Sequence, residues 1–240
     1  MTSAFQPKPE YLRLTDLHAF YGESHILHGL DLSVAKGECI TLLGRNGSGR
    51  TTTLKSIMGL VGRRTGSIMV NGNEVIHVPT HKIAHHGVGY CPEERAIFTS
   101  LSAEENLTLA PIVSSGGMSV DELYTMFPNL GERRTSPGGK LSGGEQQMLA
   151  MARILRTGAK LLLLDEITEG LAPVIVKKLG EVITELKIRG FTIILVEQNF
   201  RFAAPLADRH YVLEHGEIIA TITRDELPGK MDWLHHTLGV

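Results

Sequence analysis

The chain has 240 residues, which is enough for one large α/β domain or two small ones. Hydrophobic residues make up 42% and charged residues 21% of the sequence, as in a soluble globular protein, and the formal net charge of -2 gives no reason to expect a nucleic-acid partner. With only Cys39 and Cys91, the sequence offers no disulfide framework, which suits a reducing compartment, and we interpret Cys39 as a small core residue.

Taken in order, the chain alternates short apolar runs with helical patterns. Strands are predicted at 11–21 and 29–43, a helix at 51–60, a hairpin at 65–75 with Asn71-Gly72 as its turn, and helices between 99 and 136. A turn followed by a helix is predicted at 141–158, buried parallel strands at 160–166 and 191–198, and a closing hairpin at 207–223. The chain start has no signal pattern, and no apolar run is long enough to span a membrane, so we expect other chains to supply any spans.

The segment "GRNGSGRTTT", residues 44–53, has the form of a phosphate-binding loop between a strand and a helix. Gly44, Gly49 and Thr51 occupy the motif positions, but Arg50 stands where lysine is usual. Backbone N–H groups from Asn46 to Thr51 can surround phosphates at a helix start, and Thr51 can place its hydroxyl on Mg²⁺. The pattern alone leaves an ordinary glycine-rich turn as the alternative.

The strand "KLLLLDE" ends in two adjacent carboxylates, Asp165 and Glu166. Buried charges need a compensating partner, so a cation is expected at this strand end. Asp165 is predicted to hold Mg²⁺ through water, and Glu166 is predicted to polarise the attacking water. The alternative is a strand that simply runs into a polar turn.

The segment "LSGGEQQ", residues 141–147, predicts a second anion site at a helix start. Ser142 would present a hydroxyl, and Gly143 and Gly144 would present bare backbone N–H groups. An ordinary helix cap, with Ser142 followed by Glu145, explains the same residues, and both interpretations can hold together. Two phosphate-binding helix starts in one chain favour a site shared between subunits.

In their order, these motifs resemble those of an ATP-binding cassette (ABC) ATPase over nearly the whole chain. Within that family, "CPEERAIFTSLSAEENL", "DEITEGLAP" and "ILVEQNFRFA" resemble the ATPase subunits of branched-chain amino-acid importers. Most cassettes have glutamine in place of Glu93 and histidine in place of Gln198, whereas in the branched-chain subgroup Glu and Gln look normal. Ile167 departs from the usual proline, as Arg50 departs from the usual lysine.

The resemblance implies an α/β P-loop NTPase fold with a RecA-like core and an antiparallel β subdomain. It implies one ABC ATPase domain over 1–240, with a helical subdomain inserted at about 95–150. It also implies ATP and Mg²⁺ as cofactors, two membrane permease subunits and a second ABC ATPase subunit as partners, and an indirect link to an extracytoplasmic solute-binding protein. The expected location is the cytoplasmic face of the inner (plasma) membrane, as a peripheral protein.

The same resemblance implies roles for individual residues. Tyr21 would stack on adenine, Glu93 would sense nucleotide next to the membrane subunits, and residues 169–173 would cross the dimer interface. Gln198 would hydrogen-bond the γ-phosphate, because an amide can orient a group but carries no charge. Glu166, Gln198 and Arg50 would be catalytic, and Thr51, Asp165 and Glu93 would hold the metal. The implied nucleotide-binding residues are Tyr21, Gly44, Arg45, Asn46, Gly47, Ser48, Gly49, Arg50, Thr51, Thr52, Glu93, Ser142, Gly143 and Gly144.

The function predicted from the sequence is ATP hydrolysis that drives solute uptake, with a branched-chain amino acid or a related small polar solute as cargo. Arg50 keeps the cation but is longer and planar, so a non-hydrolysing subunit beside an active ATPase is an alternative. A soluble cassette outside transport is another. Among the histidines, His81 and His85 are spaced as a helical pair, but no acidic or cysteine partner accompanies them, so a solvated surface is favoured over a metal site.

Overall fold

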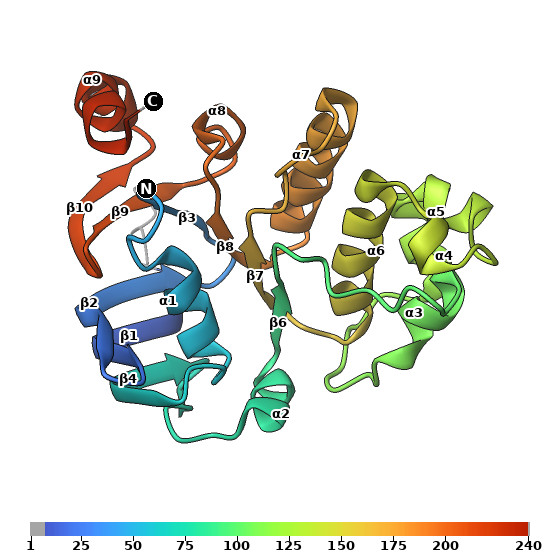
Figure 1. Ribbon diagram of the computed structural model, residues 1–240, viewed down its shortest axis with the longest axis horizontal. Coiled ribbons are helices and arrows are strands. Elements are labelled where there is room, and N and C mark those ends of the chain that lie inside the picture. The colour runs from blue at the N-terminus through green and yellow to red at the C-terminus, as the bar shows by residue number, and fades with distance from the viewer. Residues whose placement is uncertain (1–7, 240) are drawn as a thin grey trace, which may run out of the picture.

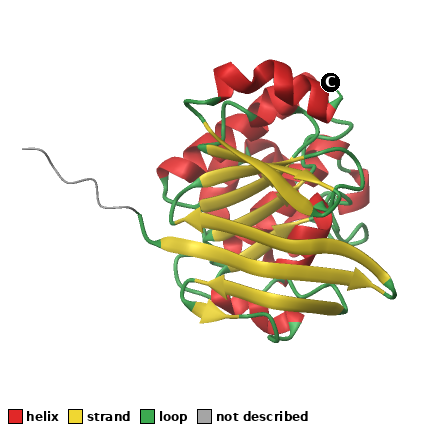
Figure 2. Ribbon diagram, turned by 90° about the vertical axis from the view of Figure 1, so that its left-hand side faces the viewer, coloured by secondary structure: helices red, strands yellow, loops and turns green. Residues whose placement is uncertain are grey.

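The computed structural model describes residues 8–239. Its strands form two sheets, and its helices lie mostly beside the parallel one (Figure 1). This arrangement confirms the predicted α/β fold with an antiparallel β portion. Figure 2 shows the long strands of the antiparallel sheet toward the viewer, with helices behind them.

The antiparallel sheet has the strand order β2-β1-β4-β5. It consists of β1 (Glu10–Tyr21), β2 (Ser24–Ala35), β4 (Arg63–Val70) and β5 (Asn73–Glu74). The turn between β4 and β5 is the predicted Asn71-Gly72 turn, and both residues have positive φ, at 46° and 79°. Such a turn matches the right-handed twist of the strands it joins.

The second sheet has the strand order β10-β9-β3-β8-β7-β6. The strands β3 (Cys39–Leu43), β6 (Val88–Cys91), β7 (Leu161–Asp165), β8 (Thr192–Val196) and β9 (Arg209–Glu214) are parallel, and β10 (Glu217–Thr223) pairs antiparallel with β9. Every residue of β3, β7 and β8 is buried. Burial on both faces explains why these strands are continuous apolar runs rather than alternating ones.

Two hydrophobic cores share the parallel sheet. Leu162 and Leu164 of β7 face the core under the helices, whereas Leu161 and Leu163 face the core beneath the antiparallel sheet. A strand alternates its side chains between two faces, so one short apolar run joins both cores. The sheet is therefore held rigidly from both sides.

Helices gather at one end of the parallel sheet, where α3, α4 and α5 pack against α6 (Figure 1). This group covers most of the segment predicted as a helical subdomain, although its status as a separate subdomain stays a prediction. The α-helices are α1 (Arg50–Ile57), α2 (Thr80–Ile83), α3 (Ala103–Leu109), α4 (Val120–Met126), α5 (Pro128–Glu132), α6 (Gly143–Arg156), α7 (Pro173–Ile188), α8 (Phe200–Ala203) and α9 (Leu227–Leu238).

Three expectations of the sequence analysis differ from the structure. The strand predicted at 29–43 is divided between the end of β2 in the antiparallel sheet and β3 in the parallel sheet. The hairpin of β9 and β10 does not end the domain, because α9 follows it and Leu234 packs into a third apolar cluster with Val212 and Ile222. His81 and His85 do not share one α-helix, because α2 ends at Ile83 and a 3₁₀ turn follows before Gly87, at φ 80°, leads into β6. Both histidines are exposed, as expected.

Candidate functional site

The carboxyl ends of β3, β8, β7 and β6 lie along one edge of the parallel sheet, and the loops that follow them meet there. In open α/β sheets this edge is where ligands bind. A cavity of about 460 Å³ opens at this edge. Its lining includes most of the site residues predicted from the sequence, together with Ile26 and Glu169, which were not predicted. The predicted residues that line it are Tyr21, Asn46, Gly47, Ser48, Gly49, Arg50, Thr51, Thr52, Glu93, Glu166 and Gln198.

The loop after β3 has the backbone of a phosphate cradle. Gly47 and Gly49 adopt φ 81° and 105°, which side-chain-bearing residues rarely do, and a Cβ on Gly44 would lie 2.5 Å from the carbonyl oxygen of Leu213. The first N–H groups of α1 have no acceptor within the helix and are open to an anion. The Ser48 hydroxyl is buried without a hydrogen-bond partner in the described part of the chain. A polyphosphate fits this loop, because it would supply the missing acceptors.

Arg50 begins α1 and is buried among hydrogen-bond acceptors at the wall of the cavity. Its Nη2 atom lies 3.1 Å from Oε1 of Glu166 and 3.2 Å from Oδ1 of Asn46. Its Nη1 atom donates to the carbonyl oxygen of Glu197 at 3.2 Å. The sequence predicted the cation at this position but not its pairing with Glu166, because nothing local in the sequence links residues that are 116 positions apart.

Glu166 receives a second hydrogen bond from Gln198, which was also predicted to be catalytic. The Nε2 atom of Gln198 lies 2.7 Å from Oε2 of Glu166. Glu166 adopts φ 47°, an unfavourable conformation for a residue with a side chain, and such residues are concentrated at functional sites. Arg50, Glu166 and Gln198 therefore form one connected group at the mouth of the phosphate loop.

Thr51 and Asp165, both predicted to hold the metal, are in direct contact. The Thr51 hydroxyl donates to Oδ1 of Asp165 at 3.1 Å, and the hydroxyl of Tyr90 donates to Oδ2 at 2.9 Å. Burial raises the pKa of Asp165, and the hydrogen bonds from Tyr90 and Thr51 oppose that shift. Two adjacent oxygen ligands fit Mg²⁺, which prefers a few protein oxygens together with phosphate and water. Tyr90 was missed by sequence reasoning, since a tyrosine within a strand carries no functional signal.

Glu93 and Tyr21 lie on the rim of the same cavity. Tyr21 ends β1, and its side chain is 45% exposed. Glu93 belongs to a group with Glu166 and Glu169 whose nearest carboxylate oxygens lie within 4.8 Å of one another. Glu169 and this carboxylate group were not anticipated as parts of the nucleotide site.

Ser142, Gly143 and Gly144 stand apart from the cavity. Ser142 caps α6 with a complete capping box, in which its hydroxyl accepts from the backbone N–H of Glu145 and the Glu145 carboxylate accepts from the N–H of Ser142. Ser142 is exposed, and the Arg95 guanidinium lies over Gly143. Gly144 is buried against Ile175, so Ser142 is the exposed residue of this helix start.

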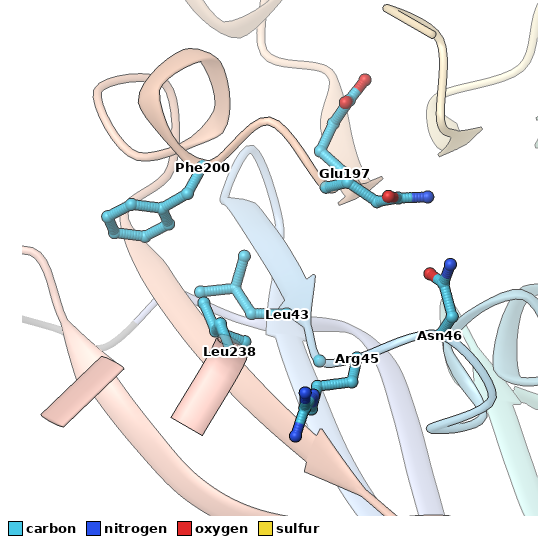
Figure 3. Close-up of a pocket in the computed structure, with 8 residues that line it drawn as sticks. Leu43, Arg45, Asn46, Glu197, Phe200 and Leu238 are labelled. Carbon is cyan, nitrogen blue, oxygen red and sulfur yellow. The ribbon is translucent and has the colours of Figure 1, made fainter. Parts of the chain in front are cut away.

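A second cavity, of about 330 Å³, lies between β3, the segment after β8 and the end of α9. Figure 3 shows Leu43 and Leu238 at its centre and Phe200 beside them. Arg45 lines this neighbouring cavity rather than the larger one, and its side chain points away from Asn46 (Figure 3). The resemblance had grouped Arg45 with the nucleotide-binding residues.

Sequence comparison decides the family. The sequence model described as ABC transporter matches residues 27–169. The chain belongs to the ABC transporter family. It is an ATP-binding cassette of the ABC ATPase type.

The cassette is 40% identical to the high-affinity branched-chain amino acid transport ATP-binding protein BraG of Pseudomonas aeruginosa, over 87% of this chain and 91% of the relative. It is 38% identical to a probable branched-chain amino acid transport ATP-binding protein, LivF, of Archaeoglobus fulgidus, over 90% and 93%. It is 33% identical to the lipopolysaccharide export system ATP-binding protein LptB of Haemophilus influenzae, over 90% and 92%. A solved ATP-binding subunit of an ABC transporter superposes with a TM-score of 0.81 at 27% identity, over 96% of this chain and all of that one, so the predicted fold is confirmed.

Proposed function

We propose that this cassette hydrolyses MgATP and that hydrolysis drives the import of a branched-chain amino acid or a related small polar solute. The observation that carries the hydrolytic part is the convergence of two donors, Arg50 and Gln198, on the carboxylate of Glu166. Gln198 holds one carboxylate oxygen beside the phosphate cradle, and the other oxygen can orient an attacking water once Arg50 has moved to phosphate.

The proposed roles follow from position. The backbone N–H groups at the start of α1 hold the phosphates, Tyr21 stacks on the base, and Gln198 reaches the γ-phosphate. Arg50 binds phosphate oxygens and gives up its contact with Glu166 as it does so, because one guanidinium edge cannot serve both acceptors. Glu166 is then free to accept a hydrogen bond from water. Phosphoryl transfer depends mainly on such positioning and electrostatic stabilisation.

Thr51 and Asp165 are the residues that would hold Mg²⁺. When bound, the ion would neutralise charge on the phosphate oxygens. Glu93 is proposed as a further contact, although its carboxylate is grouped with Glu166 and Glu169.

The exposed Ser142 at the start of α6, outside this chain's own nucleotide cavity, supports a two-cassette assembly. A second ATPase subunit would place its phosphate loop against this surface, so that each nucleotide is held by both chains. The membrane partners would be two permease subunits at the cytoplasmic face, with a solute-binding protein acting on their other side. No helix within residues 8–239 has the length and apolar character needed to cross a bilayer.

The direction of transport and the solute are inferred from resemblance. BraG and LivF are more similar in sequence to this chain than LptB is. Glu93 and Gln198 also match the pattern of the branched-chain subgroup, which favours import of an amino acid over export of a lipid.

A second candidate is a nucleotide-binding subunit that does not hydrolyse ATP. The contact between Arg50 and Glu166 favours it, because a guanidinium that stayed on Glu166 would block the water site. The intact Asp165, Thr51 and Gln198 contacts oppose it.

The test is reconstitution of the cassette with the permeases encoded beside its gene, in proteoliposomes that contain MgATP. Uptake of labelled leucine, isoleucine or valine in the presence of the cognate binding protein is the expected result, and Glu166→Gln should abolish it. ATP turnover without uptake of any of the three would contradict the assigned solute. An absence of turnover in the native complex would contradict hydrolysis by this subunit.

A further inference from the structure

Glu197 is a buried carboxylate at the end of β8, directly before Gln198, and none of the roles above uses it. It is 3% exposed. Its side chain points away from Leu43 and Leu238 and thus out of the second cavity (Figure 3). A buried carboxylate is costly unless it is hydrogen-bonded, so its partners indicate what it does.

Both carboxylate oxygens of Glu197 bind one residue, Thr168. Oε1 accepts from the backbone N–H of Thr168 at 3.1 Å, and Oε2 accepts from its hydroxyl at 2.7 Å. Thr168 is itself buried and lies two residues after Glu166. The two hydrogen bonds therefore tie the turn that follows Glu166 to the end of β8.

That turn needs external support. Glu166 adopts φ 47°, which costs an ordinary residue roughly 1–2 kcal/mol. Ile167, which follows, lacks the ring by which a proline would fix its own φ. Within the turn, the N–H groups of Glu169 and Leu171 make long backbone hydrogen bonds of 3.3 Å each. The shorter bond from the Thr168 hydroxyl to Glu197 is the firmer restraint.

Glu197 also connects Arg50 and Gln198, the two residues that contact the Glu166 carboxylate. Its backbone carbonyl accepts from Nη1 of Arg50 at 3.2 Å. Its chain neighbour, Gln198, donates to Glu166 at 2.7 Å. One residue thus fixes the distances between the phosphate loop, the turn after Glu166, and the amide that contacts the same carboxylate.

We propose that Glu197 is a positioning residue for ATP hydrolysis, and that its two hydrogen bonds to Thr168 hold the turn after Glu166 in the conformation that aims the Glu166 carboxylate. The inference rests on the proposed hydrolytic function. It concerns geometry and not charge: glutamine can make both bonds, because its amide oxygen accepts from the Thr168 N–H and its amide nitrogen donates to the Thr168 oxygen. Burial raises the pKa of Glu197 to about 7, so glutamine also resembles its protonated form.

The kinetic test compares Glu197→Met, Glu197→Gln and Thr168→Val in the assembled complex. Glu197→Met and Thr168→Val should lower kcat roughly 10- to 100-fold, because small displacements of a catalytic group have effects of that order. The KM for ATP should stay within about twofold, since the phosphate cradle is untouched. Glu197→Gln should retain most of the native turnover. Equal losses in Glu197→Gln and Glu197→Met would overturn the proposal, as would an unchanged kcat in Thr168→Val.

A matched control is Thr41→Val, which removes another buried threonine hydroxyl, located in β3 and bonded to His210 at 2.7 Å. Its kcat should equal the native value. A loss as large as that in Thr168→Val would show a general effect of removing buried hydroxyls and would overturn the assignment.

Amide hydrogen exchange of the full chain without nucleotide separates this inference from the proposed function, because it needs no turnover. The Thr168 amide should exchange at least about tenfold faster in Glu197→Met and near the native rate in Glu197→Gln, since exchange reports local opening. Equal exchange in the native chain and Glu197→Met would overturn the inference even if the complex hydrolyses ATP. If the native complex has no turnover but the exchange pattern is as expected, the proposed function fails and Glu197 still holds the turn.

Discussion

The Nη2 atom of Arg50 lies 3.1 Å from Oε1 of Glu166, and both side chains are buried. The cation predicted to bind phosphate and the carboxylate predicted to orient water thus form a buried ion pair. Removing one member of a buried pair costs more than removing both, because it leaves the other charge uncompensated.

The first prediction concerns this pair in the nucleotide-free chain. Arg50→Ala should lower the free energy of unfolding by about 3–5 kcal/mol, since it leaves Glu166 buried without its cation. The same substitution in a Glu166→Gln background should cost less, with a coupling energy of at least about 1 kcal/mol. Urea denaturation of the native protein, the two single variants and the double variant measures the coupling energy of this double-mutant cycle.

The control cycle uses Arg189→Ala and Glu185→Gln, an exposed pair one turn apart at the end of α7. Its coupling should be below about 0.5 kcal/mol. Additive effects at Arg50 and Glu166 would show that their contact contributes nothing to stability.

The second prediction concerns catalysis by Arg50. Arg50→Lys should retain or raise the ATPase rate of the assembled complex. The lysine ammonium keeps the positive charge, but it is too compact to hydrogen-bond Glu166 and Glu197 at the same time. Arg50→Ala should abolish turnover, because Arg50 is the only basic side chain proposed to bind the β- and γ-phosphates. Steady-state turnover with saturating MgATP is the measurement. A native rate in Arg50→Ala would rule out Arg50 as a phosphate contact, and turnover that appears only in Arg50→Lys would favour the non-hydrolysing subunit.

Most of the fold could be predicted because several strands of the parallel sheet are continuous apolar runs, and because recognisable sequence motifs follow them. Asp165 and Glu166, for example, follow a run of four leucines, and the phosphate loop follows another buried strand. The helix α9 was missed because its sequence carries a proline and a glycine in its first turn, which weaken a helical pattern.

Within the site, single motifs could be predicted but their mutual contacts could not. The hydrogen bonds between Arg50 and Glu166 and between Glu197 and Thr168 join residues that are far apart in the chain. A lone glutamate at the end of a strand also has no distinguishing spacing, so Glu197 could not be selected from the sequence. Only the strand order, which places β8 between β3 and β7, brings these residues together.

The third prediction concerns the base. Tyr21→Ala should weaken MgATP binding to the isolated chain by about 1–3 kcal/mol, the range found when stacking aromatics are removed. Trp233→Ala, which removes another partly exposed aromatic outside the cavity, is the control and should leave binding unchanged. Isothermal titration gives both affinities. Equal affinities for Tyr21→Ala and the native chain would exclude stacking.

The fourth prediction concerns assembly. Glu166→Gln should bind MgATP, turn over very slowly and accumulate as a dimer, because the amide cannot act as a base while the two phosphate-binding surfaces remain intact. Size-exclusion chromatography with and without MgATP measures this. In the same background, Ser142→Ala should reduce the dimer fraction, since it removes the hydroxyl at the start of α6. A monomer under saturating MgATP would contradict self-association and leave a heterodimer with another cassette.

The fifth prediction concerns the pH dependence of stability. Burial raises the pKa of Glu197 from 4.5 to about 7, so between these values the folded chain holds a proton that the unfolded chain has lost. Stability from this group is therefore complete below about pH 4.5 and is lost as the pH rises through 7. Glu197→Gln has no such titration. Its stability relative to the native chain should thus rise by an amount on the order of 3 kcal/mol between pH 4.5 and pH 8, at 1.36 kcal/mol per pKa unit.

Urea denaturation of both proteins at several pH values between 4.5 and 8 measures this difference. Glu105→Gln is the matched control, because hydrogen bonds from the backbone and side chain of Ser102 lower the pKa of that exposed carboxyl. A lowered pKa changes stability with pH in the opposite direction. Glu105 adds stability as the pH rises toward the pKa of its carboxyl in the unfolded chain, and it adds nothing further once the carboxyl is ionised in both states. The relative stability of Glu105→Gln should therefore fall slightly at the acidic end and stay flat through neutral pH, while that of Glu197→Gln climbs. Parallel profiles for native and Glu197→Gln proteins would mean that the Glu197 carboxyl titrates alike in both states, and that its hydrogen bonds to Thr168 offset the cost of burying its charge.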